Sequence, residues 1–293
     1  MNTNNESPGA TQIGEDIKST PATTRAYMTD LEARGFTPVR HSFVQQHSLF
    51  ASSSRKAPLA HLVAARRERE LNAYLLLLMN FSQLEKRTEP LPATVWARAM
   101  SPREDDPLPE QAVSRIWKNL EEHKLIDRTR KWKRAHVLPR DESTTRKYTR
   151  PRPDAVADEE RYREIYFILP SAYWTEGWHA TLSLPARALL LIMLHGTSSA
   201  EDTYLPYAKA EDWYGISTKT AERGIVELLD TKLLKITRKE KVRADFAATG
   251  FTTRTYYTPT GHFSTTARKA LQDQTKRESE ARSSRRLRTS DDE

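Results

Sequence analysis

Residues 214–230 read YGISTKTAERGIVELLD, and this stretch decides the fold. Gly215 ends a preceding helix, expected at about 207–214, because glycine readily takes the positive φ of a tight turn between helices. Ser217 begins the next helix. Its inward face is expected to hold four apolar residues at helical spacing, Ala221, Ile225, Leu228 and Leu229. Its outward face is expected to be polar and partly basic, with Thr218, Lys219, Thr220, Glu222 and Arg223.

The flanking segments predict the rest of a small domain. A strand is expected at 162–169, and Ser183 and Pro185 predict the start of a helix with Leu189 on its core face. Two further strands, 233–238 and 251–258, form a hairpin whose long connection begins with three cations, Lys239, Lys241 and Arg243. Three helices followed by a two-stranded hairpin is the element order of a winged helix.

The same pattern occurs once more, earlier in the chain. Superposing Arg115 on Arg223 also aligns Leu120 with Leu228, at an offset of 108 residues (223 minus 115). Leucine-rich helices at 75–79 and 189–193 precede the two copies at an offset of 114 (189 minus 75), because the first copy has a longer loop at 101–107. A repeat of this length predicts a duplicated domain and not a solenoid.

The first copy predicts helices at 69–81, 93–100 and 109–122 and strands at 125–130 and 135–138. Val113, Trp117 and Leu120 form the inward face of the third helix. The hairpin tip is a basic cluster around one aromatic residue, Lys131, Trp132, Lys133 and Arg134. Such a tip is short enough to lie against a duplex backbone or in a minor groove.

Composition completes the predicted domain organisation. Residues 1–25 are polar and read as a disordered tail, and the proline-rich stretch 139–160 reads as an exposed linker. The linker separates winged-helix domains at 26–138 and 161–263, and residues 264–293 read as a frayed helix with a basic tail. The predicted fold class is therefore mainly α with small β wings (α+β), two winged-helix domains in tandem.

Charge and cysteine usage limit the partners. The chain has 293 residues, with 47 Lys and Arg against 39 Asp and Glu, and its net charge of +8 favours polyanions. The absence of cysteine excludes disulfides and thiolate metal sites. The longest apolar run, 188–194, is too short to cross a bilayer. We expect a soluble cytoplasmic protein without a membrane partner, cofactor or metal.

The stretch from Ala208 to Leu228 resembles the helix-turn-helix of bacterial winged-helix proteins, and the tandem arrangement is similar to plasmid and phage replication initiators. The resemblance implies double-stranded DNA as the partner and a site at the nucleoid or on a plasmid. It assigns base contacts in the second copy to Ser217, Thr218, Lys219, Thr220 and Arg223. In the first copy it assigns them to Gln111, Ser114, Arg115 and Lys118, although that copy lacks the Gly-Ile-Ser turn.

These residues suit nucleic acid because an arginine on a helix in the major groove can donate two parallel hydrogen bonds to guanine. The leading prediction is a sequence-specific double-stranded DNA-binding protein that regulates transcription or replication. A replication initiator that binds origin repeats is one alternative, and a winged-helix adaptor that binds other proteins is another. A homodimer through residues 27–50 or the C-terminal helix is a further alternative.

Simpler interpretations exist for several of these residues. Arg115 and Arg223 could pair with nearby carboxylates, and Trp117 and Trp213 are expected in the core. The sequence has no phosphate-binding glycine loop and no His-Glu-x-x-His motif, so no enzyme is predicted. Tyr256 or Tyr257 could serve as a nucleophile, but tyrosines in strands usually pack.

Overall fold

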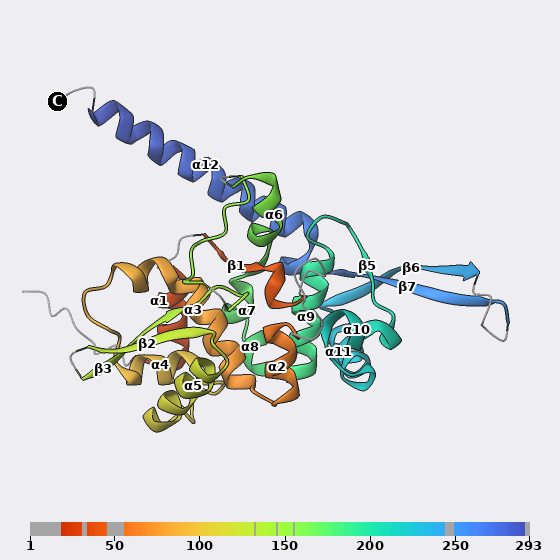
Figure 1. Cartoon of the computed structure of the whole chain (residues 1–293), viewed down its shortest axis with the longest axis horizontal. Coiled ribbons are helices and arrows are strands. Elements are labelled where there is room, and N and C mark those ends of the chain that lie inside the picture. The colour runs from red at the N-terminus through yellow and green to blue at the C-terminus, as the bar shows by residue number, and fades with distance from the viewer. Residues whose placement is uncertain are drawn as a thin grey trace, which may run out of the picture.

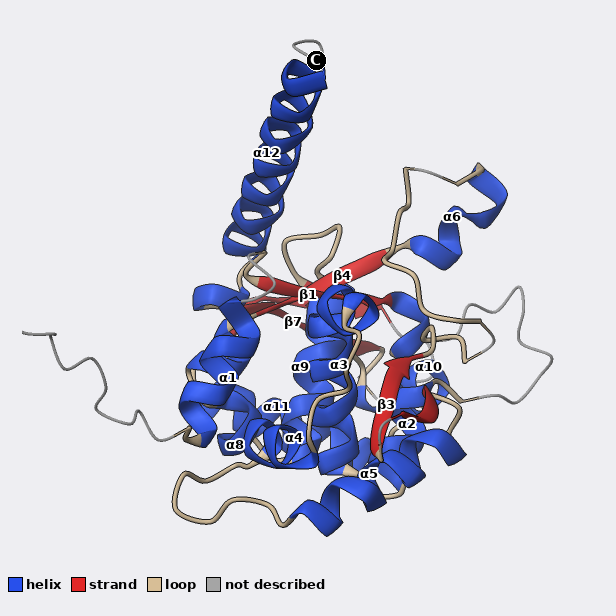
Figure 2. Cartoon of the chain, turned by 90° about the vertical axis from the view of Figure 1, so that its left-hand side faces the viewer, coloured by secondary structure: helices blue, strands red, loops and turns tan. Residues whose placement is uncertain are grey.

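The computed structural model describes residues 19–30, 34–45, 56–131, 133–144, 146–154, 156–243 and 249–290. Within them the fold is mixed α+β, with small antiparallel sheets beside a larger helical body. The hairpins β2–β3 and β6–β7 lie at opposite ends of the longest axis (Figure 1). Helix α12 extends from one side of the body, and helices α5 and α11 lie on the other side in both views (Figures 1 and 2).

The first half of the chain holds five α-helices, one 3₁₀ helix and three strands within the described residues. They are α1 Pro21–Asp30, β1 Phe36–Arg40, η1 His41–Phe43, α2 Pro58–Ala64, α3 Glu68–Lys86, α4 Ala93–Met100, α5 Glu110–Glu122, β2 Ile126–Lys131 and β3 Arg134–Pro139. The predicted helices and strands of the first repeat agree with α3, α4, α5, β2 and β3 to within a few residues, because their apolar spacing is regular.

The second half begins with α6. Its elements are α6 Asp158–Glu164, β4 Tyr166–Pro170, α7 Ala172–Thr175, α8 Trp178–Thr181, α9 Leu184–Gly196, β5 Thr203–Tyr204, η2 Tyr207–Lys209, α10 Ala210–Tyr214, α11 Thr218–Asp230, β6 Leu234–Arg243, β7 Phe251–Pro259, η3 Gly261–Phe263 and α12 Thr265–Ser290. Strand β5 pairs with β7, so this hairpin belongs to a sheet with the order β5-β7-β6. The three cations at Lys239, Lys241 and Arg243 lie within β6 and not in the connection, which corrects the prediction.

Both repeats therefore have three helices followed by an antiparallel hairpin. In the second repeat α9 packs against α11, and Gly224 allows close contact between the two helices. A Cβ on Gly224 would lie 2.6 Å from the carbonyl oxygen of Pro185 and 2.8 Å from Cγ of Leu189. In the first repeat the rings of Trp96 and Trp117 meet edge to face between α4 and α5. These contacts hold the helices together within each repeat.

A sheet of two strands that the repeat pattern did not predict as a pair joins the halves. Strand β1 pairs antiparallel with β4, with Thr37 opposite Leu169, and all five β1 residues are buried. Just after β1, the ring of His41 lies 4.4 Å from that of His195 on α9. Burial lowers the pKa of His41 to about 4 and that of His195 to about 3, so both rings pack as neutral groups at pH 7. The buried apolar residues of both halves form one continuous core.

The segment 139–160, predicted as an exposed linker, is instead anchored by buried charges. Arg40 at the end of β1 is 1% exposed, and its Nη1 donates to Glu142 Oε2 at 2.9 Å. Its Nη2 donates to Glu164 Oε2 at 2.8 Å. Arg146 extends the network to Glu164 at 3.2 Å and to buried Asp141 at 2.7 Å. The proline content of this segment predicted an exposed linker. Two of its acidic residues are buried nevertheless, because guanidinium groups pair with them.

Further polar contacts cross the junction between the halves. The Asn72 amide of α3 donates to the carbonyl oxygen of His179 at 3.0 Å and accepts from the Tyr173 hydroxyl at 2.8 Å. Arg187 of α9 is 1% exposed and pairs with Glu68 of α3 at 2.9 Å. The Asn72 contacts are buried, Glu68 is half-exposed, and all of them are directional, so together they help to fix the relative orientation of the two halves.

Both predicted tails need correction where the structure describes them. Helix α1 begins at Pro21. Its buried Arg25 donates to the carbonyl oxygen of Ser101 at 2.8 Å and pairs with Glu104, both in the loop at 101–107. Residues 1–18 of the predicted disordered tail lie outside the described residues. At the other end α12 is continuous to Ser290, and its buried Arg268 donates to the carbonyl oxygens of Leu194 and Thr197.

None of the described helices is long and apolar enough to span a bilayer.

Replacing Glu142 with Gln should destabilise the protein by about 3 kcal/mol, because Arg40 would remain buried with only one of its two carboxylates. Urea unfolding followed by circular dichroism measures this. Asp105→Asn is the control, since it removes a carboxylate from an exposed pair with Arg103 and should leave the unfolding midpoint nearly unchanged. Equal midpoints for the two variants would show that the buried network does not hold the halves together.

Candidate nucleic-acid interface

The outward face of α5 carries the residues predicted for the first repeat. Gln111, Ser114, Arg115 and Lys118 are all exposed. The inward residues Val113, Ile116, Trp117 and Leu120 are buried, with at most 3% of each accessible, as the helical spacing predicts. Hydrophobic burial of one side therefore fixes which side of α5 faces solvent.

The outward face of α11 carries the residues predicted for the second repeat, but three of them already have partners. Ser217 is the N-cap, and its hydroxyl accepts from the Thr220 backbone N–H at 3.2 Å and lies 2.9 Å from the Thr220 hydroxyl. The Thr218 hydroxyl donates to the Tyr207 carbonyl oxygen at 3.3 Å. These contacts shape the first turn of α11 and leave Lys219 and Arg223 as its exposed cations.

Arg115 and Arg223 occupy equivalent positions in the two repeats and have the same environment. Each is exposed, and in the described part of the chain neither forms an ion pair or a side-chain hydrogen bond. The simpler interpretation, pairing with nearby carboxylates, is therefore not observed here. By contrast, Lys118 lies 3.9 Å from Glu122 one turn along α5. The two guanidinium groups are free to bind an external acceptor.

A groove of about 560 Å³ separates α5 from the β2–β3 hairpin. It brings predicted residues from both elements together, Ser114 from the helix and Lys133 and Arg134 from the hairpin. Four cations and two carboxylates line this groove; they are Arg128, Arg130, Lys133, Arg134, Glu110 and Glu121. Two of the cations are partly compensated, since Arg128 lies 3.9 Å from Glu121 and Arg134 lies 3.7 Å from Glu89. The groove is net cationic.

The sequence prediction missed Arg128 and Arg130. Strand alternation is the signal that could have found them, because residues two apart in β2 share one face of the hairpin. Lys131, Lys133 and Arg134 of the predicted tip are exposed, and Lys133 adopts a left-handed conformation at φ +63°. Trp132, predicted as a possible DNA contact, lies outside the described residues.

The second repeat shows one wrong prediction and one missed feature. Trp213, predicted in the core, is 41% exposed on α10, whereas Trp117 is buried as predicted. Val226 on the outward side of α11 is 50% exposed. Both side chains leave apolar surface exposed in the second repeat. The periodicity that placed Trp213 inside could not anticipate the short length of α10.

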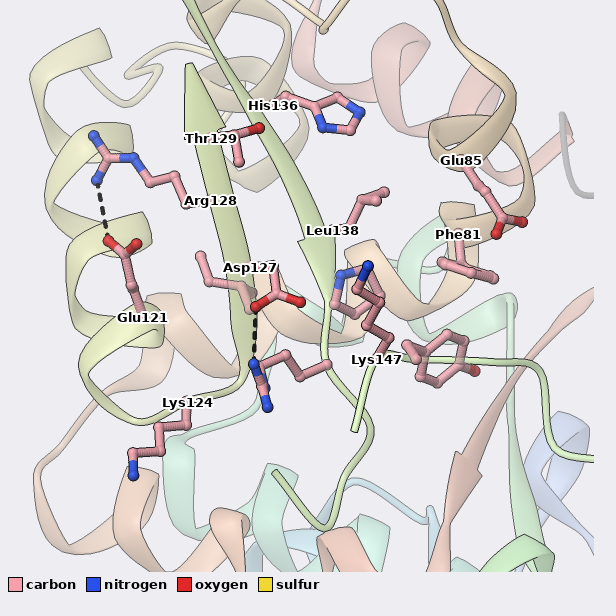
Figure 3. A pocket seen from close by; sticks show the side chains of 14 residues that line it. Phe81, Glu85, Glu121, Lys124, Asp127, Arg128, Thr129, His136, Leu138 and Lys147 are labelled. Carbon is pink, nitrogen blue, oxygen red and sulfur yellow. Dashed lines mark hydrogen bonds and ion pairs between the residues drawn. The ribbon is translucent and has the colours of Figure 1, made fainter. Parts of the chain in front are cut away.

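A larger groove, about 1090 Å³, lies on another side of the β2–β3 hairpin (Figure 3). Its charges are mixed, and two of its cations are paired: Arg128 faces Glu121, and Arg140 donates to Asp127 at 2.9 Å. Glu85 and Lys147 lie across the groove from Glu121. None of the sequence-predicted nucleic-acid residues lines it. Its four cations face three carboxylates, a smaller excess of positive charge than in the groove beside α5, which is therefore the better candidate site for a polyanion.

The two tyrosines considered as nucleophiles, Tyr256 and Tyr257, have structural roles in the sheet. Burial raises the pKa of the Tyr257 hydroxyl well above its usual range, which keeps it protonated, and the Tyr256 hydroxyl donates to Glu240 at 3.0 Å. In the described residues no group of three or more histidine, cysteine or acidic side chains is placed to hold a metal ion.

The sequence matches no protein-family model, no curated protein and no solved structure. Similarity to a protein of known function therefore contributes nothing to the assignment. The features that bear on function are the exposed faces of α5 and α11, the charges around them and the arrangement of the two repeats.

Gly215→Ala should cost about 2–3 kcal/mol of stability and perturb the turn before α11. Gly215 has a φ of +67°, and a Cβ there would lie 2.8 Å from the Cβ of Ala60 on α2. Gly250→Ala is the matched control: its φ is +70°, but no atom lies within 4 Å of the added Cβ, so the cost should be about 1 kcal/mol. Thermal unfolding of both variants measures the difference. Equal losses would show that α2 does not constrain the turn.

Proposed function

We propose that this protein binds double-stranded DNA in a sequence-specific manner through two winged-helix modules and so regulates transcription or replication. In this proposal α5 and α11 are the helices that enter the major groove, and the β2–β3 and β6–β7 hairpins are the wings. The element order in each repeat, three helices and then an antiparallel hairpin, supports the assignment of the modules.

One observation carries the proposal: Arg115 and Arg223 occur at equivalent positions of two repeats, both exposed and both without a partner in the described residues. Leaving a guanidinium unpaired at the same place twice makes little contribution to folding. It does provide two parallel donors for the O6 and N7 acceptors of guanine or for a phosphate. Lys219 and the cations around the smaller groove add phosphate contacts.

A replication initiator that binds origin repeats is the narrower form of this proposal. It is supported by the polar junction around Arg40, which fixes one module relative to the other. Modules held in this way suit target sites of constant geometry at a nucleoid or plasmid origin. Direct repeats beside an AT-rich segment in the preferred DNA would favour the initiator over a transcriptional regulator.

The adaptor alternative predicts that the third helices are covered by protein. Within this chain the outward faces of α5 and α11 are exposed, which favours DNA. A homodimer through residues 27–50 would not use β1, because β1 is buried against β4 of the same chain. Tyr27 on α1 is 63% exposed. Residues 31–33 and 46–50 lie outside the described residues.

An electrophoretic shift assay tests the proposal with duplexes selected from a random pool. Affinity should fall steeply between about 50 and about 200 mM salt, because several phosphate contacts displace condensed counterions. Failure to bind any selected duplex at the lower salt concentration would contradict DNA binding.

Arg223→Ala should weaken binding to the selected duplex by about 1–3 kcal/mol and relax specificity at one base pair, if Arg223 pairs with guanine. Arg277→Ala removes the same charge from α12, on the opposite side of the body, and should leave both affinity and specificity near those of the unchanged protein. A uniform loss across all duplexes for Arg223→Ala would reassign that residue to phosphate contact.

A further inference from the structure

The β6–β7 hairpin projects from the body (Figure 1). Its register gives it two chemically different faces. Residues that pair directly across an antiparallel ladder lie on the same face, and each face is continued every second residue. One face, here called the paired face, contains Arg238 opposite Tyr256 and Glu240 opposite Arg254. The other, here called the cationic face, contains three pairs: Lys239 with Thr255, Lys241 with Thr253, and Arg243 with Phe251.

The charges of the paired face are satisfied within the protein. The Arg238 guanidinium lies 3.6 Å from the centre of the Tyr256 ring and 3.1 Å from Asp202. Arg238 also lies 3.6 Å from Glu240, and Arg254 lies over the ring of Tyr204. This face is therefore occupied by its own network of cations, carboxylates and aromatic rings.

The cationic face differs from the paired face in its charges. Lys239, Lys241 and Arg243 are exposed, and in the described strands no carboxylate lies on this face. Lys239 and Lys241 form no ion pair within the described residues. The residues opposite the two lysines are threonines, whose short side chains allow a surface to approach the backbone of the ribbon.

Phe251 lies at the outer end of the cationic face and is 55% exposed. Exposing this much aromatic surface on a projecting hairpin has no structural benefit for the monomer. The backbone of Phe251 is held in place, because it pairs with Arg243 and its carbonyl oxygen accepts from the Thr249 hydroxyl at 3.0 Å. Phe251 is thus an exposed apolar side chain on a paired strand, on the same face as three cations.

We infer that the cationic face of this hairpin lies along the minor groove of duplex DNA and that Phe251 inserts between two base pairs and bends the duplex. This inference rests on the proposed DNA binding and adds a role that the predicted phosphate contacts do not include. Apolar wedges on cationic elements unstack base steps and kink DNA toward the major groove. Pyrimidine–purine steps such as TA unstack most easily, so Phe251 would favour them without reading base edges.

The experiment uses the full chain and a duplex of about 30 base pairs that carries several TA steps within the selected binding sequence, with a fluorescent donor and acceptor at its ends. A second duplex of the same sequence contains 2-aminopurine at the TA steps to report unstacking. Binding of the unchanged protein should raise both the energy transfer and the 2-aminopurine fluorescence.

Phe251→Ala should abolish most of both signals while the duplex remains bound, and Thr252→Ala, on the opposite face beside it, should preserve them. The double variant Lys239→Ala, Lys241→Ala should lower the dependence of log affinity on log salt by about 2. Lys269→Ala on α12 should not change the salt dependence.

The outcomes separate this inference from the proposed function. If the unchanged protein binds no duplex, both are wrong. If it binds but produces neither bending nor unstacking, or if Phe251→Ala bends DNA as well as the unchanged protein, the wedge is wrong and DNA binding stands. If both signals depend on Phe251 but the lysine pair leaves the salt dependence unchanged, the cationic face does not lie along the phosphates and the inferred orientation is overturned.

Discussion

The buried guanidinium of Arg40 is the contact on which the arrangement of the molecule depends. A charge with 1% exposure is tolerated only when carboxylates replace its hydration, and here Glu142 and Glu164 do so from two sides. Arg40 ends β1, Glu142 lies between the repeats, and Glu164 ends α6 just before β4. One side chain therefore ties together the N-terminal strand, the connection and the start of the second repeat.

This constraint changes how two repeated modules would bind a polymer. Modules on a flexible tether gain from effective concentration but accept variable spacing, whereas modules in a fixed orientation bind only sites whose spacing matches. The neutral rings of His41 and His195 and the pair between Glu68 and Arg187 strengthen the same junction. Helices α5 and α11 lie on the same side of the body, so under the proposed function a single duplex would contact both (Figures 1 and 2).

The sequence predicted the elements that have local, periodic signals. The apolar spacing in α5 and α11 identified both helices and their exposed faces, and Gly215 and Ser217 identified the turn between α10 and α11. The sequence did not predict the pairing of β1 with β4, which depends on contacts between residues far apart in the chain. The buried state of Glu142 was missed for the same reason, since its partner Arg40 is 102 residues away.

The candidate site was predicted in part. Charge and helix position identified Arg115 and Arg223. The sequence did not show that the side chains of Ser217, Thr218 and Thr220 form hydrogen bonds at the start of α11. The division of the β6–β7 hairpin into paired and cationic faces required the register, because a bulge between Ile236 and Arg238 shifts the alternation.

The spacing of the half-sites in bound DNA tests the central claim most directly. Hydroxyl-radical footprints on duplexes in which the two half-sites are moved apart one base pair at a time report whether both modules are engaged. A rigid junction between the repeats predicts that both half-sites are protected at one spacing and that one loses protection when the spacing changes by a few base pairs. Protection of both half-sites over a broad range of spacings, or protection of a single half-site at every spacing, would contradict the account.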